Sequence, residues 1–253
     1  MVEQDVNDVL TEIYKQQDKE AAKIIKIMGT TCTKKCDSCC YLLTTITLAE
    51  GILLAEKLLD QPNWFSLLPK LKEAALAYCY KGITPASYLS KKIPCIFLDT
   101  KERLCTIYDN RPGTCRYHHV ISNPANCHPD HPTGITAALP TRKLLNEVWE
   151  LSRILAAQYK VGVGNNLAPM PLMLLYCMMG ISTGGKGKRL LREATAGLPT
   201  PSGFLKHYSS SILFAEVKSI AEGYYVPEEN CNDPNQLSIY DGVKKSPDNG
   251  SHL

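Results

Sequence analysis

The chain has 253 residues, which is long enough to bury a large hydrophobic core in one large domain or two small ones. An apolar fraction of 44% and a charged fraction of 21% are ordinary for a globular protein and exclude a collagen-like, coiled-coil or fully disordered chain. The 28 basic and 25 acidic residues give a net charge of +3, which provides no argument for a nucleic-acid or membrane surface.

The N-terminus and the cysteine count bear on the compartment. The first residues, MVEQDVNDVLTEIYKQQDKE, are polar and acidic and lack the basic start and apolar middle of a signal peptide. The longest apolar stretch, Leu167 to Ile181, contains two prolines and is shorter than the roughly 18 to 20 residues of a membrane helix. The 11 cysteines are an odd number, which argues against a complete disulfide framework. We therefore expect a cytoplasmic protein with reduced thiols and no membrane partner.

Periodic apolar residues predict two helices on either side of the first cysteines. From Val6 to Met28 the apolar residues recur at helical spacing with polar residues between them, which predicts a long amphipathic helix. Thr47 is followed three residues later by Glu50 and then by a leucine-rich run, a pattern typical of a capping box at a helix start. This second helix should end near Asp60.

A third helix and a small hairpin are expected before position 110. Residues 64–80 are predicted to be helical, with Pro69 either kinking the helix or lying near its start and with Cys79 on it. Residues 95–108 form two short apolar arms around a polar turn, which fits a small hairpin or a compact loop. The segment 110–140 is rich in proline and lacks helical periodicity, so it should be irregular and held in place by other groups.

The second half of the chain is predicted to be helical up to a polar tail. The segments with a helical pattern are 144–159, 169–179, 184–194 and 209–221. From Pro227 onward the chain is polar, so residues 227–253 should be loosely ordered. We therefore expect a mainly α protein, in which a single helical domain, 1–226, contains an irregular cysteine-rich metal-binding region, 30–131, and at most a small hairpin.

The cysteines are clustered, and the clustering indicates a metal site. Seven of them lie in two short segments: Cys32, Cys36, Cys39 and Cys40, then Cys95, Cys105 and Cys115. Soft thiolate ligands select zinc, copper(I) or iron–sulfur centres, and the two-residue gap between Cys36 and Cys39 lets one turn aim both sulfurs at one metal. Cysteine is also a common core residue, which is the simpler interpretation of Cys79 and Cys177 on apolar helices. Packing alone does not explain CDSCC, because that segment has no other apolar residue.

Basic residues and a histidine-rich loop accompany the cysteines. Lys34, Lys35 and three arginines favour thiolate over thiol and offset the negative charge of several thiolates: Arg103, Arg111 and Arg116. Arg111 and Arg116 are candidates for orienting the sulfurs or binding an anionic substrate, although Arg111 could instead cap a turn or pair with Asp109. The loop after position 117 offers further candidate ligands for a second site, namely His118, His119, Cys127, His128 and His131. A polar surface loop without a ligand role is the alternative, and Cys127 is the member expected to join the main cluster.

The second cysteine segment carries a specific resemblance. Together with TCTKKCDSCC, the segments PCIFLD and LCTIYDNRPGTCRYH resemble the CxxCxxCC family, the YkgJ-type zinc- or iron-chelating proteins. The residues that match in these two segments are Pro94, Cys95, Cys105, Ile107, Tyr108, Arg111, Pro112, Cys115 and Arg116. The opening departs from the family pattern, because three residues instead of two separate Cys32 from Cys36. The resemblance covers residues 30–120 and implies metal chelation, and the similarity to flagellin lysine N-methylase adds protein-modifying chemistry as an implied activity.

Seven cysteines exceed the four ligands of one tetrahedral zinc or one 4Fe-4S cluster. Either some of them are spare or there are two metals. A 4Fe-4S cluster is the first choice and a two-zinc or zinc–thiolate cluster the second. Four residues would join the two segments best, namely Cys36, Cys40, Cys105 and Cys115.

Two classes of function remain open. The first is an iron–sulfur or other metal-dependent enzyme, either an oxidoreductase or a methyltransferase-like modifying enzyme, which would lose activity in oxygen. The second is a non-enzymatic interaction module stapled by zinc, which would unfold on chelation without a redox change. An oxidised disulfide protein is disfavoured by the odd cysteine count. The substrate or protein partner is not specified by the sequence.

Overall fold

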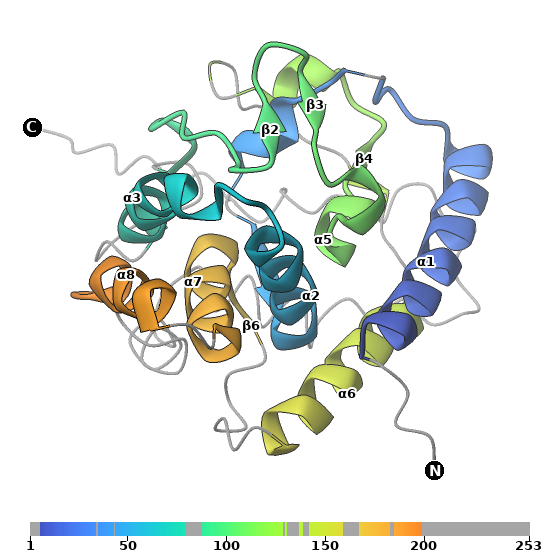
Figure 1. Ribbon diagram of the computed structural model, residues 1–253. Helices are drawn as coiled ribbons and strands as arrows, with labels where there is room; N and C mark the ends of the chain where they lie inside the picture. Colours follow the sequence, from blue (N-terminus) through green and yellow to red (C-terminus); the bar gives the residue numbers. More distant parts are fainter. Residues whose placement is uncertain are drawn as a thin grey trace, which may run out of the picture.

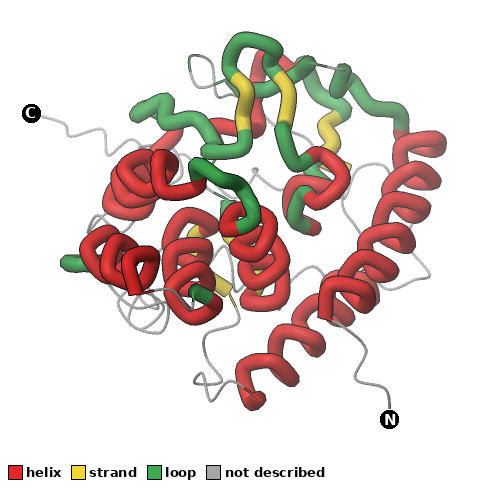
Figure 2. Tube along the Cα trace, in the orientation of Figure 1, coloured by secondary structure: helices red, strands yellow, loops and turns green. Residues whose placement is uncertain are grey.

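The computed structural model describes residues 6–33, 35–42, 44–78, 88–128, 130, 137–138, 142–158, 167–182 and 185–198. Helices dominate these residues, and the strands form only short two-stranded sheets (Figure 2). The prediction of a mainly α protein is confirmed. The helix expected at 209–221 and the polar tail 227–253 lie outside the described residues.

The helices follow the predicted order with small shifts at their ends. Their bounds are α1 Val6–Met28, α2 Leu48–Leu59, α3 Leu68–Tyr78, α6 Arg142–Gln158, α7 Met170–Ile181 and α8 Gly185–Thr195. The predicted bounds of α1 are confirmed, and α6 begins at Arg142 rather than Leu144. A 3-10 turn, η2 Trp64–Leu67, precedes α3, so Pro69 lies at the start of that helix and does not kink it. None of the helices within the described ranges combines the length and apolar character needed to cross a membrane.

The hydrophobic core is built around α7. This helix is apolar on nearly every side, and a helix of that kind must be surrounded by other elements. Helices α2, α3 and α8 pack against it, and α1 and α6 extend the core on the other side of α2 (Figure 1). The closest approach is at Gly51 of α2, where a Cβ atom would lie 2.6 Å from Cγ of Met173 and 2.9 Å from Sγ of Cys177. Glycine is therefore required at this crossing for steric reasons.

The short sheets connect segments that are mostly far apart in sequence. Strand β2 Leu98–Asp99 pairs with β3 Leu104–Cys105, which confirms the predicted hairpin. The other pairs are β1 Thr45–Thr47 with β6 Leu167–Pro169 and β4 His119–Val120 with β5 Ala137–Ala138. These two pairs are too short to be recognised in the sequence, but the first fixes the start of α2 beside the start of α7. The cysteine-bearing segments gather at one end of the helical body, near β2, β3 and α5 Gly113–Arg116 (Figure 1).

Two helix glycines provide a matched test of the α2–α7 contact. Gly51→Ala should lower the free energy of unfolding by about 1 to 3 kcal/mol, because the new methyl group overpacks the core. Gly180→Ala in α7 should be neutral or stabilising by up to about 1 kcal/mol, since a Cβ there meets nothing within 4 Å and alanine favours the helix. Urea unfolding of both variants measures the difference. Equal stability of the two variants would contradict the close contact.

Candidate metal centre

Three separate segments bring five cysteines to one partly buried region. Cys39 and Cys40 lie on η1 Ser38–Tyr41, a 3-10 turn, and Cys115 lies on the single helical turn α5. Cys95 precedes the β2–β3 hairpin and Cys105 ends β3. The backbone N–H of Cys95 donates a hydrogen bond of 2.7 Å to the carbonyl oxygen of Cys40, so the first and second cysteine segments are joined directly. We call these five residues the main thiol group.

The five thiols are close enough to act on one another's ionisation. Burial raises the pKa of Cys115 well above its usual value, and Cys39, Cys95 and Cys105 raise it further. Burial likewise raises the pKa of Cys95 to about 12, with contributions from Cys105 and Cys39. The pKa of Cys40 is raised first by its hydrogen bond with Cys39 and then by burial. Cys40, Cys95 and Cys115 therefore resist ionisation in the absence of a cation, and a bound cation would reverse that preference.

Arg111 is the basic side chain that faces this group. The pKa of Cys39 is lowered mainly by its hydrogen bond with Cys40, and Arg111 lowers it further. Burial raises the pKa of Cys105, and Arg111 opposes that increase. Its guanidinium carbon lies 4.0 Å from the ring centroid of Tyr108, a cation–π contact that holds the side chain in place. Arg111 therefore supplies positive charge beside two of the five thiols.

Arg116, the second arginine singled out in the sequence, makes mainly structural contacts. Its side chain is 2% exposed and lies 4.0 Å from the centroid of the Tyr14 ring on α1. Its guanidinium donates a hydrogen bond of 2.5 Å to the carboxylate of Asp18 and further hydrogen bonds to the backbone carbonyls of Arg111 and Asp109. Arg116 therefore fixes the turn that carries Arg111 and attaches α5 to α1.

Glu50 holds α5, the element of Cys115, against α1 and α2. Its Oε2 accepts hydrogen bonds from the backbone N–H (2.8 Å) and hydroxyl (2.9 Å) of Thr47, which confirms the predicted capping box. Its Oε1 accepts a bond of 2.7 Å from the backbone N–H of Gly113 and one of 3.4 Å from the hydroxyl of Tyr14. The carboxylate is buried, and both of its oxygens are used.

Three further cysteines lie beside the main thiol group. Cys127 ends η4 Pro124–Cys127, a 3-10 turn that packs against η1, and it is buried. Burial raises the pKa of Cys127 to about 12, with contributions from Cys32, Cys39 and Cys36 in that order. The structure therefore places Cys127 near the first cysteine segment. Cys177 is different, because its pKa is raised to about 12 by burial alone. Cys79 lies outside the described residues.

The histidines are divided between buried and exposed positions. Burial lowers the pKa of His118 to about 4, with a smaller effect from His119, and burial followed by Arg111 lowers that of His119. His118 Nε2 and His119 Nδ1 are buried and have no hydrogen-bond partner among the described residues. His128 is half-exposed, with Nδ1 3.4 Å from Oδ2 of Asp130. His131 lies outside the described residues.

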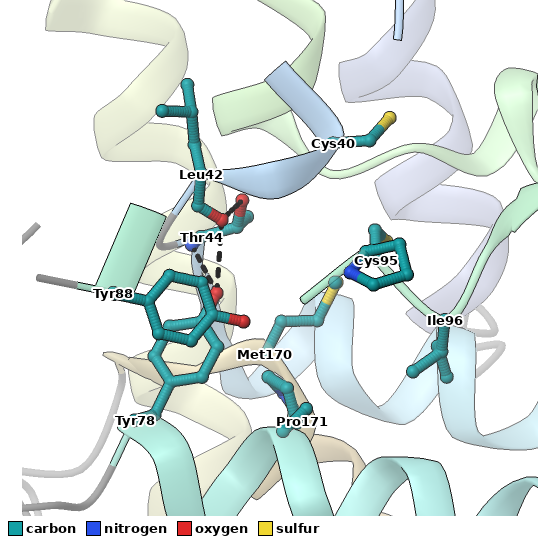
Figure 3. A pocket seen from close by; sticks show the side chains of 11 residues that line it. Cys40, Leu42, Thr44, Tyr78, Tyr88, Cys95, Ile96, Met170 and Pro171 are labelled. Carbon is teal, nitrogen blue, oxygen red and sulfur yellow. Dashed lines mark hydrogen bonds between the residues drawn. The ribbon is translucent and has the colours of Figure 1, made fainter. Parts of the chain in front are cut away.

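A small pocket adjoins the main thiol group and was not foreseen in the sequence. Cys40 and Cys95 form one side of it, and Tyr78, Tyr88 and Met170 lie opposite (Figure 3). The Tyr78 hydroxyl donates a hydrogen bond of 3.2 Å to the carbonyl of Leu42 and accepts one of 2.8 Å from the N–H of Thr44. This tyrosine therefore holds the backbone that follows η1 in place. The rings of Tyr78 and Tyr88 pack with centroids 4.2 Å apart. No sequence motif distinguishes these tyrosines from ordinary core residues.

Part of the chain matches a known protein family. Residues 31–132 match the CxxCxxCC family model. The family is described as a "Putative zinc- or iron-chelating domain". No curated protein and no solved structure matches the chain. The matched segment covers less than half of the chain and contains Cys127 and the histidine-rich loop as well as the main thiol group.

The residues present fit the metals named in that description. Thiolate is the ligand that zinc and iron–sulfur centres share. The matched segment contains eight described cysteines, all of them free thiols: Cys32, Cys36, Cys39, Cys40, Cys95, Cys105, Cys115 and Cys127. No three Cys, His, Asp or Glu side chains of the described residues are grouped to hold a single ion as they stand. Binding of a single ion would therefore require the sulfurs to turn toward a common point.

Glu50→Gln should lower the free energy of unfolding by about 1.5 to 3 kcal/mol. An amide at position 50 has only one acceptor oxygen, so its NH2 group would face the donors of either Thr47 or Gly113. Glu193→Gln on α8 is the control, because the Glu193 side chain is 65% exposed. Urea unfolding of both variants is the measurement, and a Glu50→Gln protein as stable as the control would contradict the role given to Glu50.

His118 should make the fold sensitive to mild acid. Its folded pKa of about 4 lies below its unfolded value of 6.5, so the unfolded chain binds more protons between these values. The contribution of neutral His118 to the free energy of unfolding should therefore be fully present above pH 6.5. The free energy of unfolding should decrease by up to about 3 kcal/mol as the pH falls to 4.

His118→Gln stays neutral and should reduce the slope of the stability curve, measured by urea unfolding at pH 7.5, 6 and 5, while the lowered pKa of His119 keeps part of that slope. The half-exposed His128→Gln should leave the curve unchanged. The assignment fails if both variants keep the wild-type slope.

Proposed function

We propose that the chain binds an iron–sulfur cluster, of the 4Fe-4S type, through Cys40, Cys95, Cys105 and Cys115, and uses it in redox or modification chemistry on a protein or small molecule. The observation that supports this proposal is that four thiols from three segments of the chain lie near enough to affect one another's ionisation. Among the described residues they are not grouped to hold a single ion. A 4Fe-4S cluster takes four thiolate ligands and is wider than one ion, so it does not require the sulfurs to meet at one point.

The choice of four ligands differs from the sequence-based choice at one position. The sequence favours Cys36 together with Cys40, Cys105 and Cys115. The effects of the thiols on one another's pKa support Cys95 in place of Cys36. Cys95 contributes to the raised pKa of both Cys40 and Cys115, and its backbone N–H is bonded to the carbonyl of Cys40. Cys36 contributes instead to the raised pKa of Cys127.

The surroundings suit a buried, negatively charged cofactor. When bound, an iron–sulfur cluster supplies one-electron transfer. Arg111 offsets the charge of the thiolates at Cys39 and Cys105, and the small pocket beside Cys40 and Cys95 is lined in part by apolar side chains. Reduced thiols of this kind agree with a cytoplasmic location. We further propose that residues 1–226 form one domain, which the packing of α1, α6 and α7 on α2 supports for the described residues.

Zinc gives the second candidate function, a non-enzymatic interaction module. The observation in its favour is that the irregular segment 93–128 contains little regular structure and would need an internal staple. In that case a chelator would unfold the protein, and no redox change would accompany the loss of metal.

Elemental analysis and an absorption spectrum of protein purified without oxygen separate the two functions. An iron–sulfur protein should be brown, contain iron and sulfide in equal amounts and bleach with dithionite. Colourless protein with tightly held zinc and no iron would overturn the iron–sulfur proposal and leave the zinc module.

Serine variants test the four ligands. Cys105→Ser and Cys115→Ser should lose most of the iron and the visible absorption, because each removes one of four ligands. Cys177→Ala is the matched control, since Cys177 is a buried cysteine whose pKa is raised by burial alone, and it should retain both. Far-UV circular dichroism checks that each variant is folded. Folded serine variants with full iron content would refute the assignment.

A further inference from the structure

Positive charge is concentrated on α8, which packs beside α3 and α7 and lies away from the β2–β3 hairpin (Figure 1). Four basic residues and one acidic residue give this helix a net charge of +3: Lys186, Lys188, Arg189, Arg192 and Glu193. The whole chain of 253 residues also has a net charge of +3, so the rest of the sequence is balanced in charge. The even overall balance therefore conceals one strongly basic helix.

The cations of α8 face the solvent and are largely unpaired. All four basic residues are exposed, whereas Leu191 and Ala194 form the buried face that packs on the core. Among the described residues, the one ion pair of this helix joins Arg189 and Glu193, with 3.9 Å between Nε and Oε1. An exposed pair at this distance contributes little to stability, so the positive charge remains available to a partner.

The position of two of these cations opposes helix formation. Lys186 and Lys188 lie in the first turn of α8, at the positive end of the helix dipole, and this turn contains no acidic residue. Gly187 in the same turn is a poor helix former, but packing explains it, because a Cβ there would lie 3.3 Å from Cζ2 of Trp64. Contacts among the described residues give no such reason for the lysines. Charge placed against the helix dipole without a structural gain is expected where function requires it.

An exposed aromatic ring lies beside the start of α8. Trp64 of η2 packs on Gly187, and its ring meets that of Phe65 edge to face, with centroids 6.3 Å apart. Trp64 is partly buried against the core, whereas Phe65 is 50% exposed. Lys72 of α3 donates a hydrogen bond of 3.0 Å to the carbonyl of Glu193, which holds α3 against the other end of α8. We call Phe65 and the four cations of α8 the basic–aromatic surface.

The chemistry of this surface fits a single-stranded nucleic acid. Phosphates complement the cations, and unpaired bases stack on exposed aromatic rings. A membrane fits less well, because a membrane-binding helix exposes apolar side chains next to its cations. On α8 the apolar Leu191 and Ala194 are buried, and the exposed residues are Gly185 and the five charged ones. An acidic protein segment would match the charges and would make no use of the ring of Phe65.

We propose that the basic–aromatic surface binds single-stranded nucleic acid, with phosphates on the four cations of α8 and a base stacked on Phe65. Binding is independent of base sequence, because charge attraction and stacking do not read the edges of the bases. The proposal goes beyond the proposed function and does not depend on which metal the cysteines hold. Helix α8 also lies outside the matched family segment.

Fluorescence anisotropy of a short labelled oligothymidylate tests the proposal. Full-length protein is titrated into the oligonucleotide at several concentrations of potassium chloride, and the logarithm of the binding constant should fall linearly with the logarithm of the salt concentration. Replacing two cations, Lys186→Gln with Arg189→Gln, should reduce the size of this slope by about 1.4, since each lost phosphate contact removes about 0.7. The control, Lys23→Gln with Lys26→Gln, removes two exposed lysines of α1 at the same spacing and should leave the slope unchanged.

Phe65→Leu tests the stacking of a base. It keeps an apolar side chain but removes the ring, so it should weaken binding about tenfold without changing the salt slope. Ile154→Ala on α6 is the control, because Ile154 is another exposed apolar side chain, 53% exposed, and this variant should bind like the wild type. All of the substituted residues are exposed, so the fold should be retained, and far-UV circular dichroism checks this.

The results support or overturn the proposal as follows. A reduced salt slope in the double variant of α8, together with weaker binding by Phe65→Leu, would support it. Failure of the wild-type protein to bind oligothymidylate at low salt would overturn it, and so would a double variant that keeps the wild-type slope. Binding to phosphatidylserine vesicles without binding to oligothymidylate would overturn it in favour of a membrane. Competition by polyglutamate as strong as by unlabelled oligothymidylate, with no effect of Phe65→Leu, would overturn it in favour of an acidic protein.

Discussion

The carboxylate of Glu50 is the contact that positions α5, the turn of Cys115, against α1 and α2. It is buried at the start of α2, where it completes the cap with Thr47 and accepts hydrogen bonds from Gly113 and Tyr14. One side chain therefore fixes the position of three elements: α1, α2 and α5, the turn that carries Cys115. A buried charge is stable only when its hydrogen bonds are satisfied, so this carboxylate strongly disfavours other placements of these elements.

Burial and charge act in opposite directions at the thiols. Burial raises the pKa of Cys95, Cys115 and Cys127, which keeps these groups protonated, while Arg111 and Arg103 bring positive charge to their neighbours. Such a region binds a thiophilic cation well, because the cation replaces the protons and removes the cost of the buried charge. The same balance makes metal affinity depend steeply on pH, since each thiol must lose its proton.

Local signals in the sequence were sufficient for the long helices of the described residues and for the hairpin, and insufficient for the contacts between them. The periodicity of Val6–Met28 and the Thr47–Glu50 box predict α1 and the start of α2, because both depend on neighbouring residues. The cysteine spacing likewise indicates a metal site. The second role of Glu50, the pairing of β1 with β6 and the placement of Tyr78 and Tyr88 depend on residues that are distant in sequence. The substitution of Cys95 for Cys36 among the proposed ligands has the same origin, because spacing along the chain cannot rank thiols that meet only after folding.

The pairing of β1 with β6 bears on where the metal-binding unit ends. Strand β6 comes after residue 132 and pairs with β1. Met170 and Pro171, at the start of α7, follow it directly and line the pocket beside Cys40 and Cys95. Hence the hydrophobic core contains residues from both sides of the boundary of the matched family segment. Like α1, the helices that follow residue 132 lie outside the family match, and the start of α7 lines the pocket beside two of the sulfurs. Proteins that share the cysteine segment but carry a different C-terminal half would thus have a different pocket wall beside the same cysteines.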